Sequence, residues 1–339
     1  PIPHIDYLQK NPYSYKKRKT HEILNFGDEN VPRVISDFSH DILTKEDLKS
    51  IGHTYNPLLD KWSMSDLGAD YVYLGQTLPP FMLPNGLKAI VDFSACTDLT
   101  NQYIIPLMTT YEYENNTILS AKLIKVNIHD LSINFINKIK EDQTAILLLS
   151  TTNKHAFAEL RRVFILLDEN KSTIPVIVSR NYYDVEEESF QLFTATDIGG
   201  LLVDGYGDGT LLFNNTTNTQ KINSVTFGTL QASRTRITKT EYISCPSCGR
   251  TLFDLQETTA KIRKRTEHLK GLKIGIMGCI VNGPGEMADA DFGYVGVGKG
   301  KITLYKGQEV VKRGIPEKDA LDELITIIKE NGRWIDVQN

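Results

Sequence analysis

The feature that most constrains the fold is a regular alternation of short apolar runs and helical patterns between Val31 and about Lys239. The clearest helical pattern is residues 153–170, where Phe157, Leu160 and Phe164 recur on one face. Strands that alternate with helices predict a parallel sheet. Eight runs in about 200 residues permit a (β/α)8 barrel, and a doubly wound sheet is the alternative. The predicted strands are residues 34–38, 71–74, 89–93, 123–126, 145–149, 176–178, 200–203 and 225–230.

Polar residues follow several of these runs, where parallel barrels place their active sites. They are Asp37, Asp92, Asn127, Arg180 and Asp204. The glycine-rich stretch 204–210 favours an ordinary turn over a phosphate loop. The remaining candidates lack metal-ligand spacing, so we expect structural histidines and a buried thiol at His40, His129, His155 and Cys96.

Three of the four cysteines lie in one stretch near the C-terminus, and a carboxylate follows them: Cys245, Cys248, Cys279 and Glu286. A Cys-x-x-Cys pair places two thiolates on one metal centre, and a distant third cysteine makes the site depend on the fold. Three interpretations compete: buried or redox thiols, a zinc site completed by His268, and an iron–sulfur cluster whose fourth position is open or has an oxygen ligand. The loop setting argues against the first. Spacing alone does not separate the other two.

The elements around the cysteines place them at the edge of a small α/β layer. A helix is predicted over 251–270, with its positive N-terminal end beside Cys248, and Cys279 follows a predicted strand over 272–276. The turn from Asn282 to Glu286 can bring the carboxylate back to the same point, and Asn282 is either a hydrogen-bond donor there or a turn former. A hairpin around 298–300 and a final helix from Pro316 complete the domain.

Composition predicts a soluble protein of the cytoplasm. The 339 residues carry a formal net charge of −4, which gives no indication of nucleic-acid or membrane binding, and no apolar run is long enough to span a bilayer. Cysteines in a metal-like cluster indicate a reducing compartment. Residues 1–30 are predicted to be a linker or leading arm, and the basic run 16–19 within it a solvated face.

Three segments carry a resemblance to a known family: CPSCGRT from Cys245, LKIGIMGCIVNGPGE from Leu272, and ADADFGYVGVGKGKITLYKGQE from Ala288. They resemble the C-terminal domain of the 4-hydroxy-3-methylbut-2-enyl diphosphate synthase family, in the methylerythritol phosphate route to isoprenoids. The resemblance implies a four-iron four-sulfur (4Fe-4S) cluster held by Cys245, Cys248, Cys279 and Glu286. It implies reductive ring opening of methylerythritol cyclodiphosphate, with Glu286 as a displaceable ligand, Asn282 near the substrate, and ferredoxin or flavodoxin as electron donor.

The resemblance also implies a domain plan. Residues 1–30 would be the leading arm, 31–239 a barrel-like insert acting as a structural spacer, and 240–339 the cluster domain. No segment matches the family's N-terminal catalytic barrel, so we expect this chain alone to be inactive, and a homodimer is a candidate assembly. The basic stretch 233–239 would hold diphosphate or dock an acidic electron donor, or be an exposed connector. A zinc-stabilised α/β binding module without redox chemistry is the alternative function.

Overall fold

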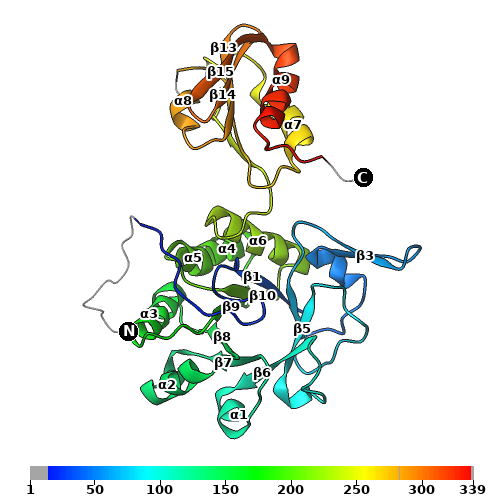
Figure 1. Cartoon of the computed structure of the whole chain (residues 1–339), viewed down its shortest axis with the longest axis vertical. Coiled ribbons are helices and arrows are strands. Elements are labelled where there is room, and N and C mark those ends of the chain that lie inside the picture. Colours follow the sequence, from blue (N-terminus) through cyan, green and yellow to red (C-terminus); the bar gives the residue numbers. More distant parts are fainter. Residues whose placement is uncertain (1–13, 282, 337–339) are drawn as a thin grey trace. The chain divides into compact units, whose positions relative to one another are not determined.

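The computed structural model describes residues 14–281 and 283–336 (Figure 1). The chain divides into two compact units, one that runs to Arg236 and one that begins at Ile237. Within the described ranges, none of the helices has the length and apolar character needed to cross a membrane.

The first unit is a closed barrel of eight parallel strands, in which β1 pairs with both β10 and β4 to complete the ring (Figure 1). This confirms the predicted (β/α)8 barrel. The strands are β1 (Arg33–Asp37), β4 (Tyr71–Tyr73), β5 (Lys88–Asp92), β6 (Ile104–Thr109), β7 (Lys122–Val126), β8 (Ala145–Ser150), β9 (Val176–Tyr182) and β10 (Gly209–Asn214).

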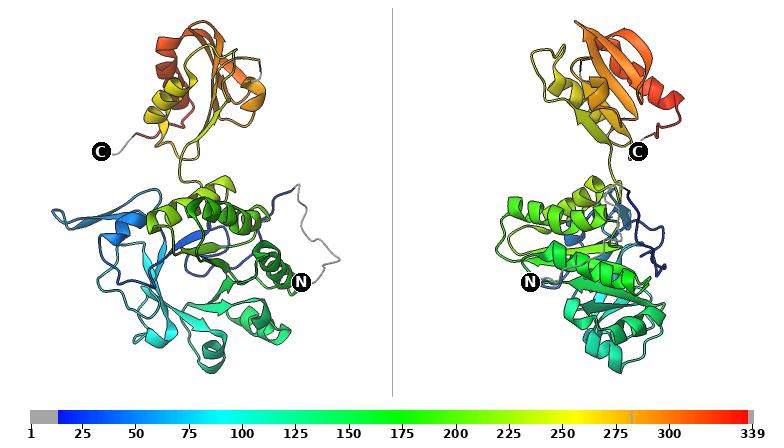
Figure 2. Two further views of the ribbon diagram at one scale, coloured as in Figure 1. Left: turned by 180° about the vertical axis from the view of Figure 1, so that it is seen from behind. Right: turned by 90° about the vertical axis from the view of Figure 1, so that its left-hand side faces the viewer.

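The connections are helical on one side of the barrel and irregular on the other. Figure 2 shows the longer helices packed outside the strands. These are α1 (Thr110–Asn115), α2 (Ile133–Glu141), α3 (Ala156–Glu169), α4 (Glu187–Thr194), α5 (Gly200–Val203) and α6 (Thr219–Ala232), with the short turns η3 (Ile128–Asp130) and η4 (Ala195–Gly199). Between β1 and β6 the connections are η1 (Asp47–Ile51), the hairpin β2 (His53–Asn56) and β3 (Lys61–Met64), and η2 (Phe93–Ala95).

Two of the eight predicted strands are wrong. Residues 200–203 form α5 and residues 225–230 lie inside α6. The true strands are β6 and β10. Burial explains the error, because a short apolar run in a helix that packs on the barrel has the same composition as a buried strand. Pro106 in β6 also lowers the strand signal, since proline cannot donate to a ladder.

The segment before β1 closes the N-terminal end of the barrel. Phe26 is fully buried and stacks on Tyr71 at a centroid distance of 4.7 Å. Arg18 is 5% exposed, and its Nε donates to Asp168 at 2.9 Å. The prediction that the basic run 16–19 is a solvated face is therefore wrong for Arg18. A guanidinium needs several acceptors once it is buried, and the barrel also supplies the carbonyls of Ser172 and Ile174.

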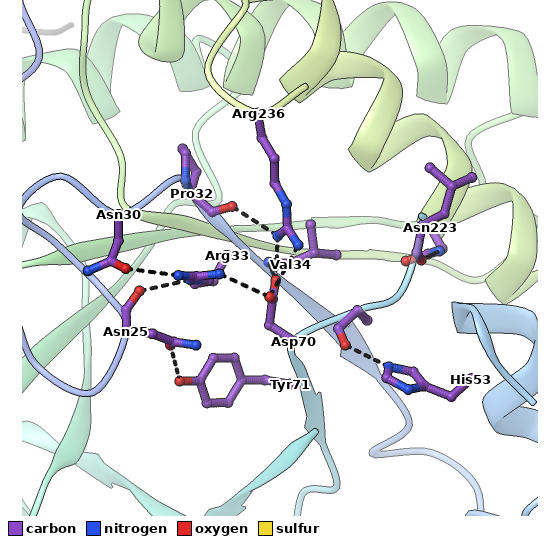
Figure 3. A network of polar contacts seen from close by, with 12 residues as sticks. Asn25, Asn30, Pro32, Arg33, Val34, His53, Asp70, Tyr71, Asn223 and Arg236 are labelled. Atoms are coloured by element: carbon purple, nitrogen blue, oxygen red, sulfur yellow. Dashed lines mark hydrogen bonds and ion pairs between the residues drawn. The ribbon is translucent and has the colours of Figure 1, made fainter. Parts of the chain in front are cut away.

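A second polar cluster fixes the exit of the chain at the same end of the barrel (Figure 3). Asp70 accepts hydrogen bonds from Arg33 Nη1 at 3.3 Å, from Arg236 Nη2 at 3.2 Å and from the Val34 N–H at 2.8 Å. The Arg236 Nη1 also donates to the Pro32 carbonyl at 3.2 Å. Asp70 therefore joins the start of β1 to the last residue of the barrel unit, and we call these residues the Asp70 network.

The second unit is a five-stranded mixed sheet in the order β11-β12-β13-β14-β15. Strands β11 (Glu241–Ser244), β12 (Lys273–Met277) and β13 (Phe292–Gly298) are parallel, whereas β14 (Lys301–Lys306) and β15 (Glu309–Pro316) are antiparallel. Helices α7 (Leu255–Thr266) and α9 (Glu317–Glu330) share one apolar core with the sheet, and α8 (Gly283–Glu286) precedes Met287, which packs in a second. The predicted hairpin and final helix are confirmed.

Candidate functional site

The three clustered cysteines follow the ends of two neighbouring parallel strands. Ser244, the last residue of β11, pairs with Ile276 near the end of β12. Cys245 therefore leaves the sheet beside the end of β12, and Cys279 follows that end by two residues. Because parallel strands end at a common edge, the fold brings cysteines 34 positions apart in the sequence to the same edge of the sheet, where α/β proteins bind ligands.

Backbone contacts of Gly278 tie the Cys-x-x-Cys loop to this edge. The Gly278 N–H donates to Cys245 Sγ at 3.3 Å, and its carbonyl accepts from the Leu252 N–H at 3.1 Å. A Cβ on residue 278 would lie 2.7 Å from Thr251 Cγ2, so only glycine permits this approach. An N–H···S contact at a cysteine is one of the interactions that tune a bound iron–sulfur cluster.

Cys248 is exposed and electrostatically activated. Its N–H donates to Thr251 Oγ1 at 3.1 Å, while its carbonyl accepts from the Thr251 N–H at 2.9 Å, which closes the turn. Hydrogen bonds from the backbone and side chain of Arg250 lower the pKa of the Cys248 thiol, and the negative charge of Glu286 opposes this shift. The hydrogen bond to Cys248, together with the charges of Cys248 and Cys279, raises the pKa of Arg250. Two thiols, a cation and the candidate carboxylate thus lie within electrostatic reach of one another.

Glu286 is held at this edge by its neighbours. A Cβ on Gly283 would lie 2.8 Å from Met277 Cβ, so α8 starts directly against the end of β12. Met287 is 1% exposed and packs in the smaller core, whereas Glu286 itself is exposed. Asn282, the other predicted catalytic residue, lies outside the described residues.

The donor set suits a metal cluster, although it does not converge on one point. All four cysteines are free thiols, and thiolates are the ligands that iron–sulfur clusters take. Among residues 14–281 and 283–336, no three His, Cys, Asp or Glu side chains lie close enough to hold a single metal ion. A multi-iron cluster binds each thiolate to a different iron, so its ligands need not meet around one ion.

The structure excludes His268 as a partner of these cysteines. His268 precedes β12 and packs edge-on against Trp334 at 5.0 Å, whereas Cys279 follows β12. A strand of five residues is roughly 16 Å long. The histidine and the thiols therefore lie at opposite edges of the sheet, which rules out the interpretation of a zinc site completed by His268.

The structure brings four of the other predicted residues to one cavity of the barrel unit: Asp37, Asn127, His129 and Arg180. Asp37 and Asp92 are the last residues of β1 and β5, Asn127 directly follows β7, and Arg180 lies two residues before the end of β9. Asp204 does not lie at a strand end: it follows α5 and precedes β10, because the predicted strand before it is a helix. Arg236 belongs to the Asp70 network, so it cannot serve as a free cation for docking. Cys96 is half-buried, and burial raises the pKa of its thiol.

Sequence reasoning gave no role to three residues that shape the cysteine edge. These are Arg250, Thr251 and Gly278. Arg250 and Thr251 belong to the GRT stretch that follows Cys248, and Gly278 directly precedes Cys279. Their position next to the cysteines is the only sequence feature that could have pointed to them.

Comparison with known proteins identifies the family of this chain. Residues 241–330 match the GcpE protein C-terminal domain. The chain is 43% identical over 295 residues to 4-hydroxy-3-methylbut-2-en-1-yl diphosphate synthase (flavodoxin) of Parabacteroides distasonis, covering 85% of this chain and 48% of the relative. The chain belongs to the 4-hydroxy-3-methylbut-2-enyl diphosphate synthase family.

Two further relatives show how the similarity is distributed. The Bacteroides thetaiotaomicron synthase (flavodoxin) is 36% identical over 343 residues, which is 99% of this chain and 52% of the relative. The chloroplastic synthase (ferredoxin) of Arabidopsis thaliana is 55% identical over 177 residues, covering 52% of this chain and 24% of the relative. The chain spans about half the length of the bacterial relatives that it matches.

Proposed function

We propose that this chain carries the cluster-bearing part of a 4-hydroxy-3-methylbut-2-enyl diphosphate synthase, which opens methylerythritol cyclodiphosphate reductively and removes a hydroxyl group. The observation that carries the proposal is the shared edge of β11 and β12, where Cys245, Cys248 and Cys279 emerge and Gly278 binds the two segments together. A 4Fe-4S cluster held there would supply single-electron transfer and a Lewis-acidic iron.

Each residue has a role suited to its position. Cys245 is half-buried and receives an N–H bond, so it is the most firmly held of the three thiolates. Cys248 is exposed, and its lowered pKa favours the thiolate form that binds metal. Glu286 is an exposed oxygen ligand at the end of a short helical turn, so it can bind or move aside without disturbing the core beneath Met287. Asn282 remains a candidate for a hydrogen bond to the substrate.

The surface around the thiols is open to a second protein or domain. Leu252, Ile280 and Val281 are 37%, 48% and 59% exposed, and all three lie on the segments that carry the cysteines. The names of two relatives include the words flavodoxin and ferredoxin. We therefore infer that a small flavin or iron–sulfur protein supplies electrons to this edge. Free thiols of this kind require a reducing compartment, which in a bacterium is the cytoplasm.

Two hypotheses about the barrel remain to be tested. One is that residues 31–239 form a spacer insert, and the other is that a further catalytic barrel must bind the substrate before turnover. Neither the fold nor the comparisons support inactivity of this chain by itself. Measuring reductive turnover of the purified chain with a chemical reductant decides the second hypothesis: any activity that depends on Glu286 removes it.

The test of the cluster is elemental analysis of protein reconstituted without oxygen. We expect about four irons and four sulfides per chain with a broad visible absorbance. Glu286→Ala should keep the three thiolate ligands but alter the electron paramagnetic resonance spectrum, whereas Glu309→Ala, an exposed glutamate on β15, should leave it unchanged. One zinc per chain and no colour after reconstitution would refute the redox function and leave the zinc-stabilised binding module.

A further inference from the structure

A polar cavity lies at the C-terminal mouth of the barrel, and none of the proposed cluster ligands lines it. Its volume is about 850 Å³, and its lining residues lie at the end of the strands opposite to the one that Phe26 and the Asp70 network close. Barrels of this class use the loops at this end to bind ligands.

The lining of the cavity includes a lysine inside the barrel. Lys125 pairs with Leu148, and Leu148 pairs with Ile177. Paired residues of adjacent strands face the same side of the sheet, and Leu148 and Ile177 both belong to the interior core. Lys125 therefore points into the barrel, and it is the exposed residue of a strand that is otherwise buried. Within the part of the chain that the structure describes, no carboxylate pairs with it.

A second lysine is presented by a rigid loop. Glu159 on the first turn of α3 accepts from Thr151 Oγ1 at 2.5 Å and from Asn153 Nδ2 at 2.6 Å, and Arg180 Nη1 donates to the Thr151 carbonyl at 2.6 Å. Both carboxylate oxygens of Glu159 therefore accept hydrogen bonds from the loop between β8 and α3, and these bonds hold the loop in place. Lys154, in the same loop, lines the cavity and is exposed. The N-terminus of α3 has no side-chain cap, so its dipole adds to the positive field.

The opposite wall of the cavity is acidic and hydrogen-bonding. Asp37 lies at the end of β1 and is half-buried, and burial raises the pKa of its carboxyl group, with the charge of Asp92 adding to the shift. Asp92 is itself engaged by Tyr73, whose hydroxyl donates to it at 2.8 Å. Asp37 accepts from the Ser39 N–H at 2.8 Å, and a carboxylate has acceptor capacity for further donors. Asp37 and the two lysines line one cavity, which suits a ligand with an anionic end and a hydroxylated end.

We propose that the barrel mouth binds a small phosphate ester that carries hydroxyl groups, with Lys125 and Lys154 on the phosphate and Asp37 on a hydroxyl. Phosphate suits the site because two lysines and a helix N-terminus are the usual elements of phosphate recognition. The inference is independent of the metal centre, and it gives the barrel a binding role beyond that of a spacer.

The test is calorimetric titration of the full chain with three probes: glycerol 3-phosphate, inorganic phosphate and glycerol. We expect glycerol 3-phosphate to bind more tightly than inorganic phosphate, and glycerol not to bind. Lys125→Met should weaken glycerol 3-phosphate binding at least tenfold, which is the lower end for a charge-assisted hydrogen bond. Lys154→Gln should act in the same direction. Lys49→Met, an exposed lysine on η1 outside the cavity, is the matched control.

The outcomes separate the parts of the proposal. Asp37→Asn should weaken glycerol 3-phosphate but leave inorganic phosphate unchanged. Equal affinity for the two phosphates would refute the hydroxyl contact. No binding of either at millimolar concentrations, or equal losses in Lys49→Met and Lys125→Met, would overturn the site. If Lys125→Met does not fold, judged by its thermal midpoint, Lys154→Gln decides between the site and its absence, because its side chain lies on the surface.

Discussion

Replacing Asp70 with alanine should destabilise the barrel strongly. The side chains of Asp70, Arg33 and Arg236 are 11%, 17% and 15% exposed. The substitution leaves two largely buried guanidinium groups without a counter-charge and the Val34 N–H without its acceptor. Breaking a buried ion pair from one side costs about 3–5 kcal/mol. Because Arg33 and Arg236 keep carbonyl acceptors on Asn25 and Pro32, we expect the lower end, about 3 kcal/mol.

The assay is thermal unfolding followed by tryptophan fluorescence. The chain has two tryptophans, Trp62 in the barrel unit and Trp334 in the second unit, so a Trp334→Phe background reports the barrel alone. For a unit of this size, about 3 kcal/mol corresponds to a fall of about 6–12 °C in the midpoint. Glu187→Ala removes an exposed ion pair with Lys221 and should cost at most about 1 kcal/mol. Equal shifts in the two variants would show that the Asp70 network does not anchor the barrel.

Three further predictions concern the cysteine edge and the cavity. Gly278→Ala forces a Cβ to within 2.7 Å of Thr251, so reconstituted protein should contain less iron and sulfide than wild type, and adding Thr251→Ala should restore part of it. Met287→Ala empties a fully buried site, which costs about 2–5 kcal/mol, measured as an earlier urea transition of the second unit. Asp37 has a folded-state pKa above its ordinary 3.8, so the folded state binds more protons, and stability falls as pH rises from about 4 through the folded pKa. Asp37→Asn should remove that slope, and an unchanged pH profile of urea unfolding would contradict it.

The sequence predicts the barrel because its strands are short, apolar and separated by helices. The strand prediction fails at α5 and α6 because a run of four to six apolar residues is too short to show a helical period. The spacing of buried residues that identifies a helix appears only when the flanking residues are included. In the helical stretch that ends in α5, Phe190, Thr194, Ile198 and Leu201 are buried at helical spacing, and that pattern is present in the sequence. β10 was missed for a different reason: the glycines before it favoured a loop, and the strand begins at Gly209 within that loop.

The cysteine edge was predictable in its residues but not in its geometry. Cys-x-x-Cys and a distant cysteine identify ligands whatever the sheet order is. The parallel pairing of β11 with β12 brings the cysteines together. Local periodicity can identify a strand, but it does not show which other strand it pairs with. The exclusion of His268 depends on the same information, because its distance from Cys279 follows from the intervening strand and not from the separation of the two residues along the chain.

The two ends of the barrel differ in a way that bears on where a ligand can bind. At the N-terminal end, Asp70 forms ion pairs with Arg33 and Arg236, and the buried Asp208 accepts hydrogen bonds from the N–H of Val176 and the hydroxyl of Thr20. At the C-terminal end, Lys125 and Asp37 line a cavity. A paired network stabilises the closed end, where the groups are buried. Lys125 at the open end is exposed, so water solvates its charge and an anionic ligand can replace that water. The open end is therefore the part of the barrel where charged side chains remain accessible to a ligand, which is why Lys125, Lys154 and Asp37 are the residues to test.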